Sequence, residues 1–214
     1  TSKSHKFYNS ENILSSAKAL VVLKSLSQIF GMLSLLFLAR VLSVEQYGIY
    51  NVILSALTLL GGIASFGIAN VLQRYLPEYI RNNNYSLAKR LFAKCCSLRF
   101  LSIVACTVAI YIYRESVFGY IQIAYDNSLL ILLFVYAVSY FQMRLTNLAL
   151  YSFLKVKLAN LSQIFVVFIK VLGYAIAFFL DWALIEILII DVLAHIVCLS
   201  LVFWFWRKQI SPLQ

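Results

Sequence analysis

The stretch "LLFLARVLSVEQYGIYNVILSAL" (residues 35–57) decides the fold, because it joins two long apolar runs through a short polar island. Arg40, Glu45, Gln46 and Gly48 are among the residues of this island. A chain of this kind either folds back on itself within a soluble core or crosses a membrane, turns in water and crosses it again. Composition and the number of similar runs decide between the two.

The composition excludes a soluble fold. Of the 214 residues, 63% are hydrophobic and only 12% are charged, and the mean hydropathy is +0.88. A soluble domain typically has about a quarter charged residues. This chain has too few polar side chains to cover a water-exposed surface, so we predict that lipid solvates it.

The apolar runs predict six membrane spans, since a bilayer core about 30 Å thick is crossed by roughly 20 apolar residues of helix. The first run is too long for a signal peptide and is predicted to be retained. Pro77 and Pro212, the only prolines, lie just beyond predicted span ends, where a helix can stop. We therefore predict an all-α integral membrane fold with spans at about 13–40, 47–74, 96–113, 128–152, 158–180 and 183–206.

The net charge of +10 reflects topology rather than nucleic-acid binding, because the cations gather on one side of the predicted spans. With a cytoplasmic N-terminus, the outer side keeps only Arg40 and Arg114, whereas thirteen of the eighteen cations lie on the inner side. Both chain ends are therefore predicted to be cytoplasmic. The inner set is Lys3, Lys6, Arg74, Arg81, Lys89, Arg90, Lys94, Arg99, Arg144, Lys155, Lys157, Arg207 and Lys208.

The longest polar segment, "PEYIRNNNYSLAKRLFAK" (residues 77–94), lies between the second and third predicted spans. It is either a solvated lead-in to the third span or an amphipathic helix on the inner leaflet. The four cysteines lie in or beside apolar runs without paired spacing, so we interpret them as packing residues.

Polar residues follow one face of each of the first two spans, since each residue turns a helix by about 100°. Lys24 and Gln28 lie on the first face, and Asn51, Ser55 and Thr58 on the second. The small residues either pack against a neighbouring helix or line a cavity. Lys24 lies about eleven residues, hence roughly 16 Å, from the nearer end of its span. A cation at that depth usually faces a wet cavity or a partner.

The fifth and sixth spans carry ionisable residues at matching depth. Lys170 and Asp191 both lie roughly 12 to 15 Å from the outer end, so an ion pair between antiparallel helices is expected. That pair either holds the helices in register or takes part in substrate binding. Asp191 and His195 are one turn apart, with Glu186 nearer the outer end, which is also compatible with a proton relay.

Arg144 lies in the inner half of the fourth span, with Tyr136, Tyr140 and Asn147 on nearly the same face. Its guanidinium either reaches the headgroups or points into a cavity where it can bind phosphate through two hydrogen bonds. The sequence contains no P-loop, GxSxG or HExxH motif and no cluster of cysteine and histidine. We therefore expect no cofactor, no metal chemistry and no enzyme activity.

Residues 39–80, "ARVLSVEQYGIYNVILSALTLLGGIASFGIANVLQRYLPEYI", resemble the N-terminal signature of the polysaccharide flippases. These belong to the multidrug, oligosaccharidyl-lipid and polysaccharide exporter superfamily. The matching features are the Ala39-Arg40 pair with Leu42, the Tyr47-Gly48 step, the segment 67–70 and the "RYLPEY" run. The resemblance is specific over about forty residues and topological over the rest.

The resemblance implies two six-helix lobes around a central, often cationic cavity with alternating access. Six spans would form one such lobe, the N-lobe, so a further C-terminal lobe of the same protein is expected. Drug-exporting relatives typically carry an acid in the first helix, whereas this chain has Lys24. This difference favours an anionic lipid-linked sugar as the substrate.

Three functions follow as hypotheses. The first is a flippase of the bacterial inner membrane that moves an undecaprenyl-pyrophosphate-linked oligosaccharide from the inner to the outer leaflet. Lys24, Arg144 and Lys170 would hold the pyrophosphate, and Gln28 and Asn51 would contact sugar. The second is a membrane-embedded polymerase acting on lipid-linked sugars, which would need a long outer loop. The third is a cation-coupled multidrug exporter, favoured by an ion site at Asp191.

Overall fold

The computed structural model describes residues 10–65, 67–115, 119, 127–153 and 155–210, without the side chains of residues 10–19 and 205–210. Within these residues the chain is all helical and contains no strand. The topology prediction depends partly on Lys3, Lys6, Arg207, Lys208 and the loop at Asp126, whose side chains lie outside this description. The helices are α1 (Ser10–Val41), α2 (Val44–Ser65), α3 (Ile68–Arg81), α4 (Tyr85–Ile112), α6 (Asn127–Ser152), α7 (Val156–Phe179) and α8 (Leu184–Ile210).

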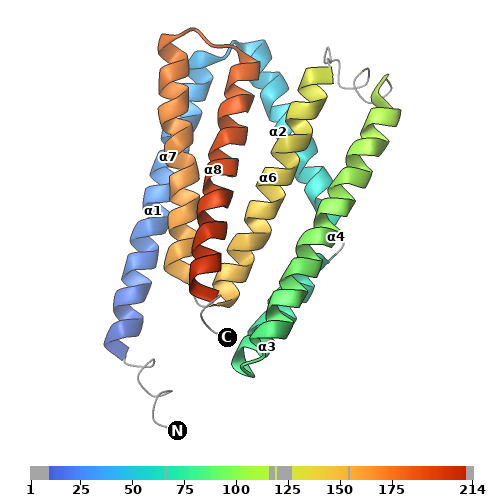
Figure 1. Ribbon diagram of the computed structural model, residues 1–214. Helices are drawn as coiled ribbons and strands as arrows, with labels where there is room; N and C mark the ends of the chain where they lie inside the picture. Colours follow the sequence, from blue (N-terminus) through green and yellow to red (C-terminus); the bar gives the residue numbers. More distant parts are fainter. Residues whose placement is uncertain (1–9, 66, 116–118, 120–126, 154, 211–214) are drawn as a thin grey trace.

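Six of the described helices are long and apolar enough to cross a membrane, which confirms the predicted number of spans. They are α1, α2, α4, α6, α7 and α8. Many of their large apolar side chains point outward, as helices surrounded by lipid require. Figure 1 shows the start of α1 and the end of α8 at the same, lower end of the bundle, as an even number of spans demands.

The second predicted span is too long, because α2 ends at Ser65 and a separate helix begins at Ile68. Gly67, just before α3, has a left-handed φ of 70°. Glycine adopts this conformation without the steric cost that a Cβ imposes. The apolar run continues through the break, so hydropathy alone gives no sign of it. Pro77 lies inside α3 rather than beyond a span end.

The polar segment 77–94 is not a loop. It comprises the end of α3, a tight turn and the first turns of α4, which begins eleven residues before the predicted third span. Asn83 in the turn has a φ of 57°, and the amide of Asn84 donates to the carbonyl of Tyr79. Helix α3 is amphipathic: Ile68, Leu72 and Leu76 are buried, and its polar residues face outward.

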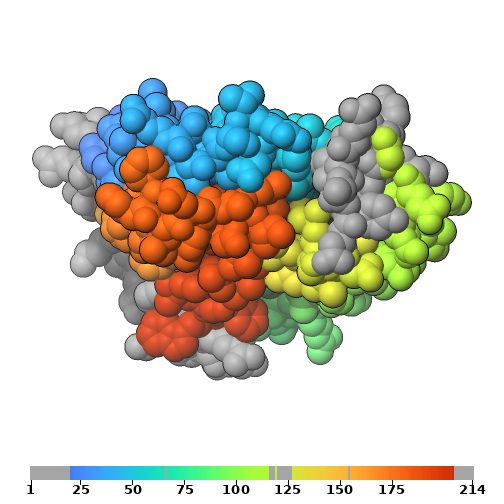
Figure 2. Space-filling model, turned by 90° about the horizontal axis from the view of Figure 1, so that it is seen from above, coloured from blue at the N-terminus to red at the C-terminus, as the bar shows by residue number. Residues whose placement is uncertain are grey.

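Figure 1 shows α7, α8, α6 and α4 side by side, with α1 and α2 behind them and α3 beside the lower part of α4. Helix α6 packs between α4 and α8, and α8 packs between α6 and α7. Helix α1 lies along α7, and α2 runs obliquely towards α4. Seen from above, the blue segments of α1 and α2 form one side of the molecule, against α7 and α8 in orange and red (Figure 2).

The buried side chains form two apolar clusters. One joins α3, α4, α6, α7 and α8 at the lower end, and it includes Leu76, Phe92 and Cys198. The other joins α1, α2, α4, α6, α7 and α8 above it, around Tyr174 and Ile187. All four cysteines are free, and Cys95 and Cys198 are buried, which fits the predicted packing role.

Two glycines allow close helix approach. A Cβ at Gly61 of α2 would overlap the ring of Phe141 on α6, and one at Gly173 of α7 would overlap Ile190 on α8. Small residues at such crossings bring helices together where the surrounding lipid gives no hydrophobic driving force. Gly62, by contrast, faces open space.

Candidate functional site

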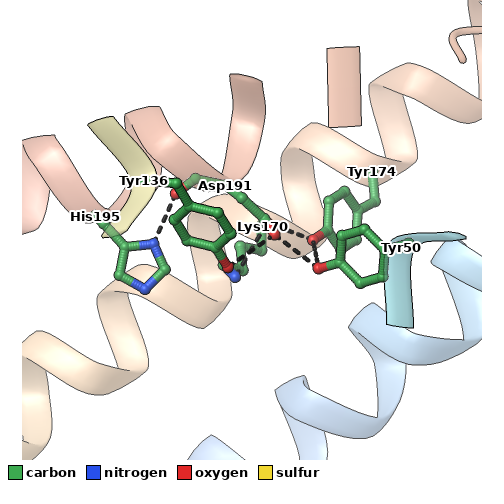
Figure 3. A network of polar contacts seen from close by, with 6 residues as sticks. All are labelled: Tyr50, Tyr136, Lys170, Tyr174, Asp191 and His195. Carbon is green, nitrogen blue, oxygen red and sulfur yellow. Dashed lines mark hydrogen bonds and ion pairs between the residues drawn. The ribbon is translucent and has the colours of Figure 1, made fainter. Parts of the chain in front are cut away.

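Asp191 of α8 is the centre of a buried polar network in the upper half of the bundle (Figure 3). Its side chain is fully buried. An ionised carboxylate in such a place needs partners for both oxygens, because an unpaired charge in an apolar interior is very costly. The partners come from α2, α6 and α7.

Lys170 of α7 is the cationic partner, with its Nζ 3.0 Å from Asp191 Oδ1. This is the ion pair that the matching depths of the two residues predict. The lysine side chain is 15% exposed, and its ammonium also lies 5.9 Å from the centre of the Tyr136 ring. The two charges thus neutralise each other inside the bundle.

Three phenols complete the coordination of the carboxylate. Tyr50 donates to Oδ2 at 2.7 Å, Tyr136 donates to Oδ2 at 3.2 Å, and Tyr174 donates to Oδ1 at 2.5 Å. The Tyr50 and Tyr174 hydroxyls also lie 3.3 Å apart. Each phenol has a single hydrogen, so both hydroxyls give it to the carboxylate. Asp191 therefore ties four helices to one point.

His195 is not joined to the Asp191 carboxylate, so the direct relay considered from the sequence is not formed. Its Nδ1 lies 2.7 Å from the backbone carbonyl of Asp191, and since a carbonyl only accepts, the ring donates this bond. The cause is the i, i+4 spacing, which directs the ring back along its own helix. The imidazole packs instead against the rings of Tyr136 and Tyr140, at 5.4 and 5.3 Å.

Glu186 also lies apart from the network. Its Oε2 accepts the amide hydrogen of Ala183 at 3.1 Å, which caps the start of α8. A carboxylate at the first turn of a helix also interacts favourably with the helix dipole. This residue thus acts as a cap rather than as part of the relay considered from the sequence.

Arg144 of α6 is exposed, and its guanidinium carbon lies 5.6 Å from the centre of the Tyr140 ring. Tyr140 in turn contacts His195 and Phe141 through its ring edge or face. A continuous set of rings therefore connects Arg144 to the surroundings of Asp191. Of the predicted site residues, the structure brings together Lys170, Asp191 and His195, and Arg144 lies next to them through the Tyr140 ring.

Lys24, Gln28 and Asn51 lie elsewhere, with exposed side chains on α1 and α2. Phe30 of α1 packs edge-on against Phe168 of α7 at 5.7 Å. By helix rise, Lys24 then lies about 12 Å below the level of Lys170. In the described part of the chain Lys24 forms no ion pair. The amide nitrogen of Asn51 donates to the carbonyl of Tyr47 at 2.9 Å.

Sequence reasoning missed two functional candidates. Tyr50 gives no sequence signal beyond the rule that a buried tyrosine needs a partner for its hydroxyl. Arg99 was predicted to be one of the inner-side cations, yet it lies in the middle of α4 and is 6% exposed. An earlier start for the third span would have placed it at mid-membrane.

The fold and the site define a multi-span helical membrane protein with one neutralised ion pair in its core and exposed cations on its helix faces. Among the described residues, no three His, Cys, Asp or Glu side chains gather where they could hold a metal ion.

Within that class the chain belongs to the polysaccharide biosynthesis protein family, which it matches over residues 13–214. This finding confirms the resemblance seen in residues 39–80. Comparisons with curated proteins and with solved structures gave no match.

Proposed function

We propose that this protein is a flippase that moves an undecaprenyl-pyrophosphate-linked oligosaccharide from the inner to the outer leaflet of a bacterial inner membrane. Membership of the polysaccharide biosynthesis family supports the substrate class. The six membrane-length helices support a location within the bilayer. In this proposal both chain ends are cytoplasmic, no covalent chemistry occurs, and a further lobe faces the outward surface of α1 and α2.

The observation that carries the proposal is the unpaired cation on α1. Lys24 lies fourteen residues after Ser10 and seventeen before Val41, so it is far from both helix ends. Its side chain is exposed, and within the described residues it has no acidic partner. By helix rise Lys24 lies about 25 Å below the outer end of α1, hence in the inner part of a bilayer core about 30 Å thick. An ammonium there is stabilised by water or by an anion. A passing pyrophosphate supplies that anion.

The polar side of α2 extends the same kind of surface. Asn51, Ser55, Thr58 and Gly62 are all exposed, and the Thr58 hydroxyl donates to its own helix at 2.9 Å. Faces that combine amides and hydroxyls suit sugar hydroxyls, which both donate and accept hydrogen bonds. In this proposal Gln28 and Asn51 contact sugar while Lys24 and Arg144 contact phosphate. Lys170 joins them only when it leaves Asp191.

The alternatives have less support. A cation-coupled drug exporter would use Asp191 as its ion site, yet the Lys170 ammonium already occupies that position. A polymerase would need a long outer loop, whereas two of the three predicted outer connections, those between α1 and α2 and between α7 and α8, are short. We therefore do not propose either function.

The test replaces Lys24 in cells that rely on this transporter alone and measures surface polysaccharide normalised to membrane-inserted protein. We expect Lys24→Ala to lose most of the normalised display. Lys24→Arg should retain part of it, because pyrophosphate accepts either cation but the guanidinium needs more room. Lys24→Glu should be the most severe, since it repels the phosphate.

Lys155→Ala is the matched control, because Lys155 is an exposed lysine that immediately precedes α7 and lies outside the proposed surface. It should display polysaccharide normally. Full normalised display with Lys24→Ala would remove Lys24 from the transport path. A parallel fall in protein level and display would instead show that Lys24 only stabilises the fold.

A further inference from the structure

Arg99 of α4 is the feature that the proposed function leaves unexplained. Its side chain is 6% exposed. It lies fourteen residues after Tyr85 and thirteen before Ile112, so about 20 Å of helix separates it from either end of α4. Its burial between helices keeps its charge away from the headgroups, which exposed arginines reach by snorkelling.

The surroundings of Arg99 do not neutralise it. Its Nε is buried without a hydrogen-bond partner, and the ion pairs of the described residues do not include it. Its guanidinium carbon lies 5.4 Å from the centre of the Phe141 ring, a contact that stabilises a cation without removing its charge. Buried guanidinium groups in folded proteins are normally paired with an anion.

A second arginine lies close to the first. Arg144 of α6 is within electrostatic range of Arg99. The two guanidinium groups lie over Phe141 and Tyr140, whose rings contact each other at 5.2 Å. Gln142 fixes this arrangement, because its Nε2 donates to the Cys96 carbonyl on α4 at 3.0 Å. Two neighbouring like charges, neither of which is paired with an acid among the described residues, form a site to which an anion would bind favourably.

From this arrangement we infer that Arg99 and Arg144 form a phosphate-binding subsite between α4 and α6, which the lipid-linked substrate occupies while it crosses the membrane. Two guanidinium forks match the oxygens of a phosphate or diphosphate. A resident phospholipid keeps its headgroup at the interface, whereas the Arg99 side chain is buried against Phe141 of α6. The inference rests on the proposed function and adds a residue that the sequence did not assign to the site.

The subsite and a purely structural role for Arg99 predict opposite effects on stability. Removing an unpaired buried charge without leaving a cavity is neutral or stabilising. Arg99→Met should therefore keep or raise the thermal midpoint of the protein without ligand. If Arg99 instead serves only to hold Phe141, the same change should lower the midpoint.

The experiment measures the thermal midpoint and affinity of the purified protein, as cells make it, with farnesyl diphosphate as the probe. Farnesol is the uncharged control. Wild-type protein should be stabilised by the diphosphate, as any ligand that binds only the folded state requires. Arg99→Met should weaken binding by at least about tenfold, which is the loss of one charge-assisted contact. Arg144→Met should weaken it to a similar degree.

Arg74→Gln is the matched control, because Arg74 is an exposed arginine that also lies over a tyrosine ring, at 5.5 Å from Tyr75. It should bind the probe like the wild-type protein. Should Arg99→Met fail to fold, Arg99→Lys keeps the charge and loses the fork, and it should still bind more weakly than wild type. Unchanged affinity in the folded Arg99 variant would overturn the subsite.

Two further arms identify the source of the phosphate. Inorganic pyrophosphate should bind more weakly than farnesyl diphosphate but with the same dependence on Arg99. Protein in nanodiscs of phosphatidylglycerol should show no Arg99-dependent stabilisation relative to phosphatidylcholine. An equal effect of phosphatidylglycerol would overturn the link to the transported lipid. Failure of the flippase proposal is separate, since it would appear as wild-type protein that does not support polysaccharide display.

Discussion

Asp191 and Arg99 are both charged and buried in the same bundle, yet their surroundings differ completely. Asp191 is surrounded by one ammonium and three phenols, whereas Arg99 has an aromatic ring and an Nε without a partner among the described residues. The first arrangement joins helices and leaves no charge for a ligand. The surroundings of Arg99 leave its charge unsatisfied, which is typical of a substrate-binding site without its ligand.

This comparison predicts that the largest loss of stability follows a substitution at Asp191. Asp191→Ala leaves the Lys170 ammonium buried and unpaired, which should cost about 3–5 kcal/mol of unfolding free energy. The double variant with Lys170→Met should recover much of this loss, because it leaves no stranded charge. Reversible unfolding in mixed micelles measures both. Additive losses in the two single variants and the double variant would show that the pair does not act as a unit.

The next largest effect on stability is expected at Gly61, which packs against the Phe141 ring beside Arg99. A Cβ at Gly61 would overlap Phe141, whose ring lies against the Arg99 guanidinium. Gly61→Ala should therefore destabilise the protein by about 1–3 kcal/mol. Gly62→Ala is the matched control, because open space surrounds Gly62 and alanine favours a helix. Equal stabilities of the two variants, compared by thermal unfolding, would contradict the close approach of α2 and α6.

The smallest expected effect on stability is the loss of a single phenol hydroxyl, either at Tyr50 in the Asp191 network or at Tyr140 beside Arg144. Tyr50→Phe removes a hydrogen bond to a carboxylate, and we expect a loss of about 1–2 kcal/mol. Tyr140→Phe should change stability little, since Tyr140 acts in the described structure through its ring. The same unfolding assay compares the two. If Tyr140→Phe lost more stability than Tyr50→Phe, the hydroxyl in the Asp191 network would not be the more important of the two.

The sequence predicted the parts of the fold that depend on composition and depth. Six apolar runs predict six spans, and the equal depths of Lys170 and Asp191 predict their ion pair, because helix rise is constant. The break after Ser65 was missed, since apolar residues continue on both sides of Gly67. A left-handed glycine has no hydropathy signal.

The rest of the site depends on helix packing, which one sequence does not reveal. Tyr50, Tyr136 and Tyr174 come from three helices and meet at one carboxylate only because α2, α6 and α7 surround α8 at that level. Arg99 was assigned to the inner side because polar residues precede it. Those residues turn out to be the first turns of α4.

The central claim is that the protein moves a lipid-linked oligosaccharide across a bilayer, and translocation in vesicles tests it most directly. The purified protein, as cells make it, is placed in vesicles whose two leaflets both contain the lipid-linked sugar. An added glycosidase then reports how much sugar becomes accessible outside. We predict digestion beyond the outer-leaflet share in vesicles with wild-type protein, and slower digestion with Lys24→Ala or Arg99→Met. Digestion that stops at the level of protein-free vesicles would contradict the account.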